Sequence, residues 1–254
     1  MGYLGRMRFL RRSPLLYDAA KSVKRTLGVT TPISRFLKQF SDAHGRRVNF
    51  VQIGASDGLR NDPIREFVVR HRWSGILVEP LPGVFDLLRR NYRRQRDDRL
   101  AFINAAVAAD TNGSLTFWTI APAALGRMPL EKRLSYLRKS SLDRDHVLRW
   151  VNGRTLREDD VVSVQVPSLT LSSLLERHWR WGHLHLLAID VEGYDLALLQ
   201  SIDFGRTAPD AILYESQNLR EGQQSARELL EYHGYQVTAM GEDTVAVLKG
   251  TVSG

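Results

Sequence analysis

The chain has 254 residues and a formal net charge of +8, with 43% apolar residues, 25% charged residues and no cysteine. This composition predicts one large or two small globular α/β domains, and it excludes disulfides, a thiolate nucleophile and any cysteine-ligated zinc or iron–sulfur site. No apolar run approaches the roughly eighteen residues of a membrane span, and the N-terminus lacks the apolar core of a secretory leader, so we expect a cytoplasmic protein.

The positive charge belongs to the N-terminal segment. Residues 1–47 contain eleven Lys or Arg and two acidic residues, whereas the remainder contains 25 basic and 26 acidic residues, a net of −1. Leu16 and Leu27 follow helical spacing, and Lys21 falls on another face. We therefore expect a basic helical extension over residues 1–45. It would pack on the domain or on a second copy of the chain, or make a peripheral membrane contact.

Over residues 46–254, short apolar runs alternate with helical patterns, which predicts a doubly wound, Rossmann-like, mostly parallel sheet with helices on both faces. The predicted strands are Val48–Ile53, Gly75–Glu79, Arg99–Asn104, Ser114–Ile120, Val161–Val166 at an edge, Leu184–Asp190, Ala211–Glu215, Tyr235–Ala239 and Thr244–Leu248. The predicted helices are Pro63–His71, Val84–Tyr92, Leu169–Trp179, Tyr194–Ser201 and Ser225–His233. A turn signal at 240–243 joins the last two strands into an antiparallel hairpin.

Residues 121–165 are the least regular part of this domain. Ala121–Leu125 is expected to be a loop, and residues 126–160 are polar, basic and weakly helical. Because the fold needs only a crossover here, we expect a lid-like insertion over the substrate. Three of its side chains are candidates for contacts with hydroxyl groups and ring faces of a substrate: Ser140, Ser141 and Trp150.

A glycine-containing turn follows the first strand and consists of Gly54, Ala55, Ser56, Asp57 and Gly58. Such a turn lets a ligand approach the backbone, and Glu79, at the end of the next strand, is placed to accept both hydroxyls of an adenosine ribose. A nicotinamide-binding turn would have G-x-G-x-x-G, whereas Ser56 replaces its second glycine. The pattern favours an adenosyl ligand without phosphates. The alternative is a structural turn beside a surface glutamate.

Acidic side chains end two later strands of the predicted sheet. Asp190 follows the most apolar strand, with Glu192 two residues on, and Glu215 ends the next strand shortly before Asn218. In a doubly wound sheet these positions border the ligand crevice, where an unpaired carboxylate is costly to bury without a role. Asp190, Glu215 and Asn218 would offer oxygen ligands to Mg²⁺. Alternatively, Glu215 orients the substrate or acts as a base. Glu192 is a candidate for a contact with the substrate, or it caps the following helix.

Four segments together resemble the FkbM-type methyltransferases in order and spacing, over roughly residues 46–250. They are V-N-F-V-Q-I-G-A-S-D-G (48–58), G-I-L-V-E-P (75–80), A-I-D-V-E-G-Y-D (188–195) and A-P-D-A-I-L-Y-E (208–215). The resemblance implies a class I S-adenosylmethionine-dependent fold with a seven-stranded sheet and a terminal hairpin. It also implies O-methylation of polyketides, sugars or glycolipids.

The resemblance further implies roles for individual residues. Cofactor contacts are implied for the turn from Gly54 to Gly58, ribose binding for Glu79 beside Pro80, adenine-side contacts for Asn104, Ala105 and Ala106, and an acceptor-side position for Asp190. Two positions depart from the family pattern. Ser56 replaces a frequent asparagine, and Ala188 stands where a lysine is frequent, so any role of that cation is missing.

The sequence thus predicts an O-methyltransferase whose acceptor is a hydroxyl of a sugar, glycolipid, polysaccharide or polyketide-type natural product. A hydroxyl is nearly inert at neutral pH, so Asp190, directly or through Mg²⁺, is the first candidate for removing its proton, and Glu215 is the second. An RNA methyltransferase or nucleic-acid binder that uses the basic arm is the alternative, although the neutral domain does not favour nucleic acid. A membrane-surface or scaffolding protein with a vestigial crevice is a third reading.

Overall fold

The computed structural model describes residues 31–95, 98–151, 153 and 155–251. Its centre is a seven-stranded sheet in the order β3-β2-β1-β7-β8-β10-β9, in which β10 runs in the direction opposite to that of the other six strands. The strands are β1 (Asn49–Ile53), β2 (Ser74–Val78), β3 (Leu100–Ile103), β7 (Leu186–Ile189), β8 (Ala211–Glu215), β9 (Tyr235–Met240) and β10 (Asp243–Leu248). The predicted sheet and its C-terminal hairpin are confirmed. Because β1 pairs in parallel with both β2 and β7, the chain reverses its direction of travel across the sheet at β1.

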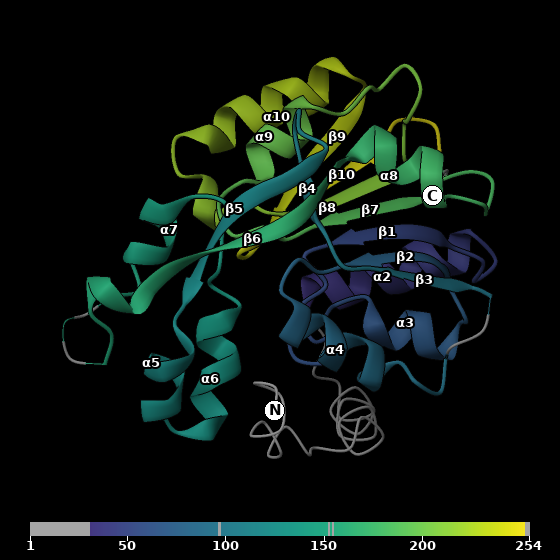
Figure 1. Ribbon diagram of the computed structural model, residues 1–254. Helices are drawn as coiled ribbons and strands as arrows, with labels where there is room; N and C mark the ends of the chain where they lie inside the picture. The colour runs from purple at the N-terminus through teal and green to yellow at the C-terminus, as the bar shows by residue number, and fades with distance from the viewer. Residues whose placement is uncertain (1–30, 96–97, 152, 154, 252–254) are drawn as a thin grey trace.

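Helices cover both faces of this sheet, as Figure 1 shows. One face packs against α8 (Leu171–His178), α9 (Asp195–Gln200) and α10 (Gly222–Tyr232). The other packs against α2 (Pro32–Ala43), α3 (Arg65–Arg70) and α4 (Pro82–Asn91). The helix α3 begins two residues later than predicted, although the Asp62 carboxylate still accepts the amides of Ile64 and Arg65 at its start.

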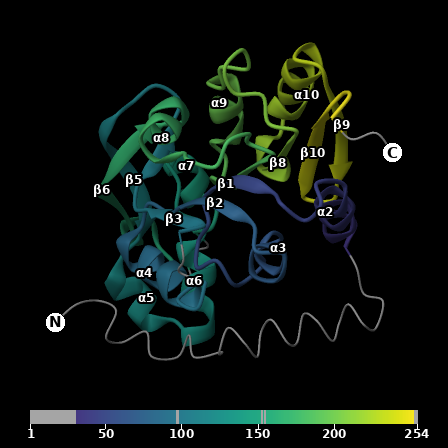
Figure 2. The same ribbon diagram turned by 90° about the vertical axis from the view of Figure 1, so that its right-hand side faces the viewer.

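A second sheet has the order β4-β6-β5 and lies at the opposite side of the molecule from the β9–β10 hairpin (Figure 2). Its strands are β4 (Ala106–Ala108), β5 (Gly113–Ile120) and β6 (Val161–Thr170). The predicted edge strand at 161–166 is wrong in two respects: it continues to Thr170, and it lies in the centre of its sheet. Thr170 then caps α8 by accepting the amide of Ser173.

The insertion between β5 and β6 is helical. It contains α5 (Pro122–Arg127), α6 (Leu130–Leu137), α7 (Arg144–Leu148) and the 3₁₀ turn η2 (Glu158–Asp160). The predicted loop at 121–125 is wrong, because Pro122 occupies the first turn of α5, where its missing amide costs no hydrogen bond. Apolar side chains of these helices share one core with β5 and β6.

The helix α2 lies within the predicted N-terminal extension and packs into the domain. Ile33, Leu37 and Phe40 are buried in the core beneath the sheet. The helical pattern from Leu16 to Leu27 lies outside the described residues, so the predicted boundary between extension and domain stays a prediction. Among the described residues, no helix has both the length and the apolarity that a bilayer span requires.

Hydrogen bonds connect the C-terminal end of α2 to the residue before β8, at the amino ends of the parallel strands. Asp210 accepts hydrogen bonds from His44 Nε2 at 2.9 Å and from His183 Nε2 at 2.8 Å. Potential ligand atoms of His44, His185 and Asp210 lie within 4.8 Å of one another. However, His185 Nδ1 accepts the amide of Asn49, so its Nε2 carries the ring proton and is not free to bind a metal. The cluster is therefore a set of structural hydrogen bonds that connects α2 to the sheet.

Candidate active site

The glycine turn after β1 forms the floor of the site. Gly54 has a φ of +79°, and a Cβ atom there would lie 1.8 Å from the carbonyl oxygen of Asp190. The turns after β1 and β7 therefore touch, and only glycine fits between them. Ser56 also has a positive φ, of +48°, which turns its amide toward the end of β2.

Glu79 follows β2 and points into the site, with only 6% of its surface exposed. Its Oε2 accepts the amide of Ser56 and its Oε1 accepts the amide of Leu81, each at 3.0 Å. One lone pair on each oxygen remains for two further donors, which is what the paired hydroxyls of a ribose offer. Burial raises the pKa of Glu79 to about 7, and the amides of Leu81 and Ser56 oppose this shift.

A pocket that opens to solvent joins these features, and the empty space in it, open solvent included, is about 630 Å³. The sequence-predicted residues that line it are Gly54, Ser56, Glu79, Pro80, Ala105, Ala106, Ser140, Asp190 and Glu192. Apolar side chains that sequence reasoning did not single out complete the wall: Leu81, Val84, Val107, Phe117, Leu137 and Leu142.

The other predicted cofactor residues support the pocket from behind. Asp57 Oδ1 accepts the amides of Leu59 and Arg60, which holds the turn after β1. Asn104 donates to the carbonyl oxygens of Glu79 and Pro80, which holds the end of β2. Two more, Ala55 and Gly58, lie in the same turn and do not line the pocket. Direct contact of these four residues with a ligand stays a prediction.

Three carboxylates meet at one end of the pocket. One oxygen each of Asp190, Glu192 and Glu215 lies within 4.8 Å of the others. The side chain of Asp190 is exposed to the open space of the pocket, yet protein encloses it at longer range. Removal from bulk water, followed by the charges of Glu192 and Glu215, raises its pKa well above the usual value. Burial and then the charge of Glu192 also raise the pKa of Glu215.

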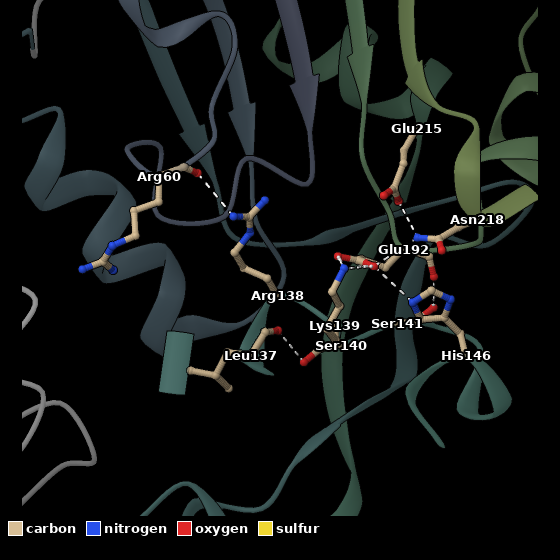
Figure 3. Close-up of polar contacts among 10 residues, drawn as sticks. All are labelled: Arg60, Leu137, Arg138, Lys139, Ser140, Ser141, His146, Glu192, Glu215 and Asn218. Atoms are coloured by element: carbon tan, nitrogen blue, oxygen red, sulfur yellow. Dashed lines mark hydrogen bonds and ion pairs between the residues drawn. The ribbon is translucent and has the colours of Figure 1, made fainter. Parts of the chain in front are cut away.

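Glu192 is the best-anchored member of this cluster (Figure 3). Its Oε1 and Oε2 accept hydrogen bonds from Lys139 Nζ at 3.1 and 3.2 Å, and its Oε2 also lies 3.1 Å from His146 Nε2. Asn218 Nδ2 donates to Glu192 at 3.3 Å and to Glu215 at 2.6 Å. Since the nitrogen of Asn218 faces the carboxylates, this side chain orients them, and its predicted role as a metal ligand would require the amide group to turn over.

The three predicted substrate residues of the insertion have different surroundings. Ser141 is fully buried, and its hydroxyl donates to the backbone oxygen of Glu192 at 2.8 Å, so it holds the turn after β7 and is not available to a substrate. Ser140 lines the pocket, but its hydroxyl donates to Leu137. Trp150 is 40% exposed and presents its ring face to Lys139 Nζ at 4.5 Å.

Sequence reasoning did not assign four polar residues to the site. Arg138 lines the pocket, and Lys139 and His146 hold Glu192. They come from the insertion, where no motif marks them. Asp195 lies in the quoted A-I-D-V-E-G-Y-D segment, which was the available signal. It is fully buried, and its carboxylate makes no hydrogen bond of good geometry to any residue that the structure describes. Burial and then the charge of Glu215 raise its pKa to about 7.

The residues fit an adenosyl amino acid. Glu79 offers two acceptor positions to ribose hydroxyls, apolar side chains line the wall for a base, and the buried hydroxyl of Ser56 has no hydrogen-bond partner within the described part of the chain. The pocket also exposes acidic and basic side chains, Asp190 and Arg138, for the charged groups of an amino acid. This donor and acceptor set matches the predicted cofactor.

Comparison with known proteins points to one family. Residues 52–237 match the model of the methyltransferase FkbM domain. A search of proteins with curated functions found no match. Among solved structures, the chain is similar to methyltransferase FkbM from Methylobacillus flagellatus KT, with 10% identity and a TM-score of 0.47 over 80% of this chain and 44% of that one. It is also similar to human methyltransferase 10 domain containing protein, with 9% identity and a TM-score of 0.45 over 92% and 97% of the two chains.

Proposed function

Since this chain belongs to the FkbM methyltransferase family and is thereby an S-adenosylmethionine-dependent methyltransferase, we propose that it methylates a hydroxyl oxygen. The acceptor class we propose is a sugar, glycolipid, polysaccharide or polyketide-type natural product. The observation that supports a hydroxyl acceptor is the Asp190 carboxylate, which faces the open pocket with a raised pKa. A carboxylate of raised basicity suits the removal of a hydroxyl proton near neutral pH.

S-adenosylmethionine supplies the electrophilic methyl group when it is bound. Gly54, Ser56 and Glu79 would hold its nucleoside, and the insertion would hold the acceptor in line with the methyl group, which lowers the barrier through positioning. Asp190 would accept the hydroxyl proton as the new bond to oxygen forms. Glu215 would stabilise the proton on Asp190, because two neighbouring carboxylates favour sharing one proton over both being ionised.

A divalent cation is a second way to activate the hydroxyl at the same place. Asp190, Glu192 and Glu215 offer hard oxygen ligands of the kind Mg²⁺ prefers. Lys139 already places a positive charge on Glu192, which supports the base without a metal. Adding a chelator to the methylation assay separates the two mechanisms. A loss of turnover that Mg²⁺ restores would show that the metal is needed, and unchanged turnover would show that the carboxylate base is sufficient.

The test of the proposed function begins with the protein as purified. Mass spectrometry should find S-adenosylhomocysteine or S-adenosylmethionine bound to it. Methyl transfer is then measured against a panel of glycans and macrolides with free hydroxyls, and against RNA. Transfer to RNA that falls steeply with salt would support the alternative acceptor and contradict the proposal.

A further inference from the structure

Arg138 reaches the pocket from the end of α6. Its Nη1 donates to the carbonyl oxygen of Arg60 at 3.5 Å, so its guanidinium lies against the turn after β1 (Figure 3). Its charge lowers the pKa of both Glu79 and Asp190. Arg138 therefore lies near the two acidic residues that mark the ribose end and the reacting end of the site.

The other cations near the pocket already have carboxylate partners. Lys139 is paired with Glu192, and Arg60 Nη1 lies 3.6 Å from the buried Asp57. Among the described residues, Arg138 has no carboxylate partner, although its side chain is only partly exposed. Arg138 is therefore the cation of the pocket wall that can form an ion pair with an anionic group of a ligand.

The amino-acid end of S-adenosylmethionine has one carboxylate and one ammonium group. The ammonium finds acidic side chains in the pocket, whereas the carboxylate finds only Arg138 among the charged residues that line it. We propose that Arg138 binds the carboxylate of the cofactor's amino-acid end. The proposal rests on the cofactor named under the proposed function, and it makes the insertion part of the cofactor site as well as of the acceptor site.

Decarboxylated S-adenosylmethionine is the direct probe, because it lacks only the carboxylate. Calorimetric titration of the wild-type protein should give tighter binding of S-adenosylmethionine than of the decarboxylated form, by about 10- to 100-fold, as expected for hydrogen bonds between charged groups. Arg138→Gln should weaken S-adenosylmethionine binding by that factor and leave the decarboxylated form unchanged. Arg138→Lys should retain part of the preference.

Arg133→Gln is the matched control, because Arg133 lies on the same helix, donates to the backbone oxygens of Met128 and Gly126, and does not line the pocket. It should retain the wild-type preference. Equal weakening of both ligands by Arg138→Gln would show a structural role, and an unchanged cofactor affinity with a raised acceptor KM would assign Arg138 to an anionic acceptor. Either result overturns the proposal. A wild-type protein that binds neither ligand would instead overturn the proposed function.

Discussion

The carboxylate of Glu79 accepts a hydrogen bond from the backbone amide of Ser56 at 3.0 Å, which joins the end of β2 to the turn after β1. The same carboxylate accepts the amide of Leu81. Glu79 thus holds together the two loops that we expect the nucleoside to contact, and it still offers an acceptor on each oxygen. We therefore predict that both cofactor binding and the local order of the site depend on this side chain.

Glu79→Ala should weaken S-adenosylhomocysteine binding by about 10- to 100-fold or more, because it removes charged acceptors of the ribose and leaves two amides without their partner. Isothermal calorimetry measures the affinity. Glu176→Gln, a change of an exposed glutamate on α8, should leave it unchanged. An unaltered affinity of Glu79→Ala would refute the predicted ribose contact.

The stability of the ligand-free protein should fall as the pH rises from about 4.5 to about 7. Glu79 and Asp195 have folded-state pKa values of about 7, above their ordinary values of 4.5 and 3.8, so the folded state binds more protons than the unfolded chain in this interval. The stabilisation that comes from this extra proton binding is fully present at low pH, and it is lost as the pH rises through the folded-state pKa. Denaturant titrations at several pH values test it. Glu79→Gln and Asp195→Asn should each flatten the dependence.

Asp190→Asn should lower kcat by about 10²- to 10⁴-fold, because the amide cannot accept the hydroxyl proton. Cofactor affinity, measured separately by calorimetry, should change far less. Glu215→Gln should lower kcat by a smaller factor, since Glu215 acts through Asp190. If Asp190→Asn retained wild-type turnover on the same acceptor, proton removal would have to be assigned elsewhere.

Asp210→Asn should lower the free energy of unfolding by about 1–3 kcal/mol, because the buried carboxylate accepts hydrogen bonds from both His44 and His183. The loss reflects weaker docking of α2 against the sheet. Chemical denaturation measures it, with Asp159→Asn, at an exposed position in η2, as the control. Equal stability of the two variants would show that these hydrogen bonds contribute nothing.

Charge reversal of Lys21, Lys24 and Arg25 to glutamate should abolish binding to anionic vesicles if the N-terminal segment makes the predicted membrane contact. Each basic residue near an anionic surface contributes about 1 kcal/mol, so reversing three should lower partitioning by at least 100-fold. Vesicle flotation at low and high salt measures it, and neutral vesicles are the control. Equal flotation of the wild-type and reversed proteins would contradict a membrane role.

Much of the fold could be predicted because the signals are local. A buried strand that ends in a glycine turn identified β1, and the turn at 240–243 identified the hairpin. The second sheet could not be predicted in the same way. At three residues, β4 is too short to show a pattern, and β6 is central only because β4 and β5 both pair with it. Those pairings are long-range contacts that no single segment encodes.

The residues of the candidate site fall into the same two groups, those marked by local sequence signals and those placed by long-range contacts. Gly54, Glu79 and Asp190 end strands of the main sheet, and the chain order alone brings such positions together. Arg138 reaches the pocket, and Lys139 reaches Glu192, only because the insertion folds back against β5. The lysine that is frequent in the family at the position of Ala188 is absent here. A different cation, Lys139 of the insertion, binds Glu192 in the turn that follows the same strand.

The contact between Gly54 and the Asp190 carbonyl oxygen has a consequence for how this enzyme can change over evolution. Any side chain at Gly54 would push apart the turn after β1, which we propose holds the nucleoside, and the turn after β7, which carries the proposed proton acceptor Asp190. The first turn therefore cannot change its position independently of the second. New acceptor preferences would have to arise in the parts of the insertion between β5 and β6 that do not contact these turns, because Ser141 and Arg138 of the insertion bind to the turns themselves.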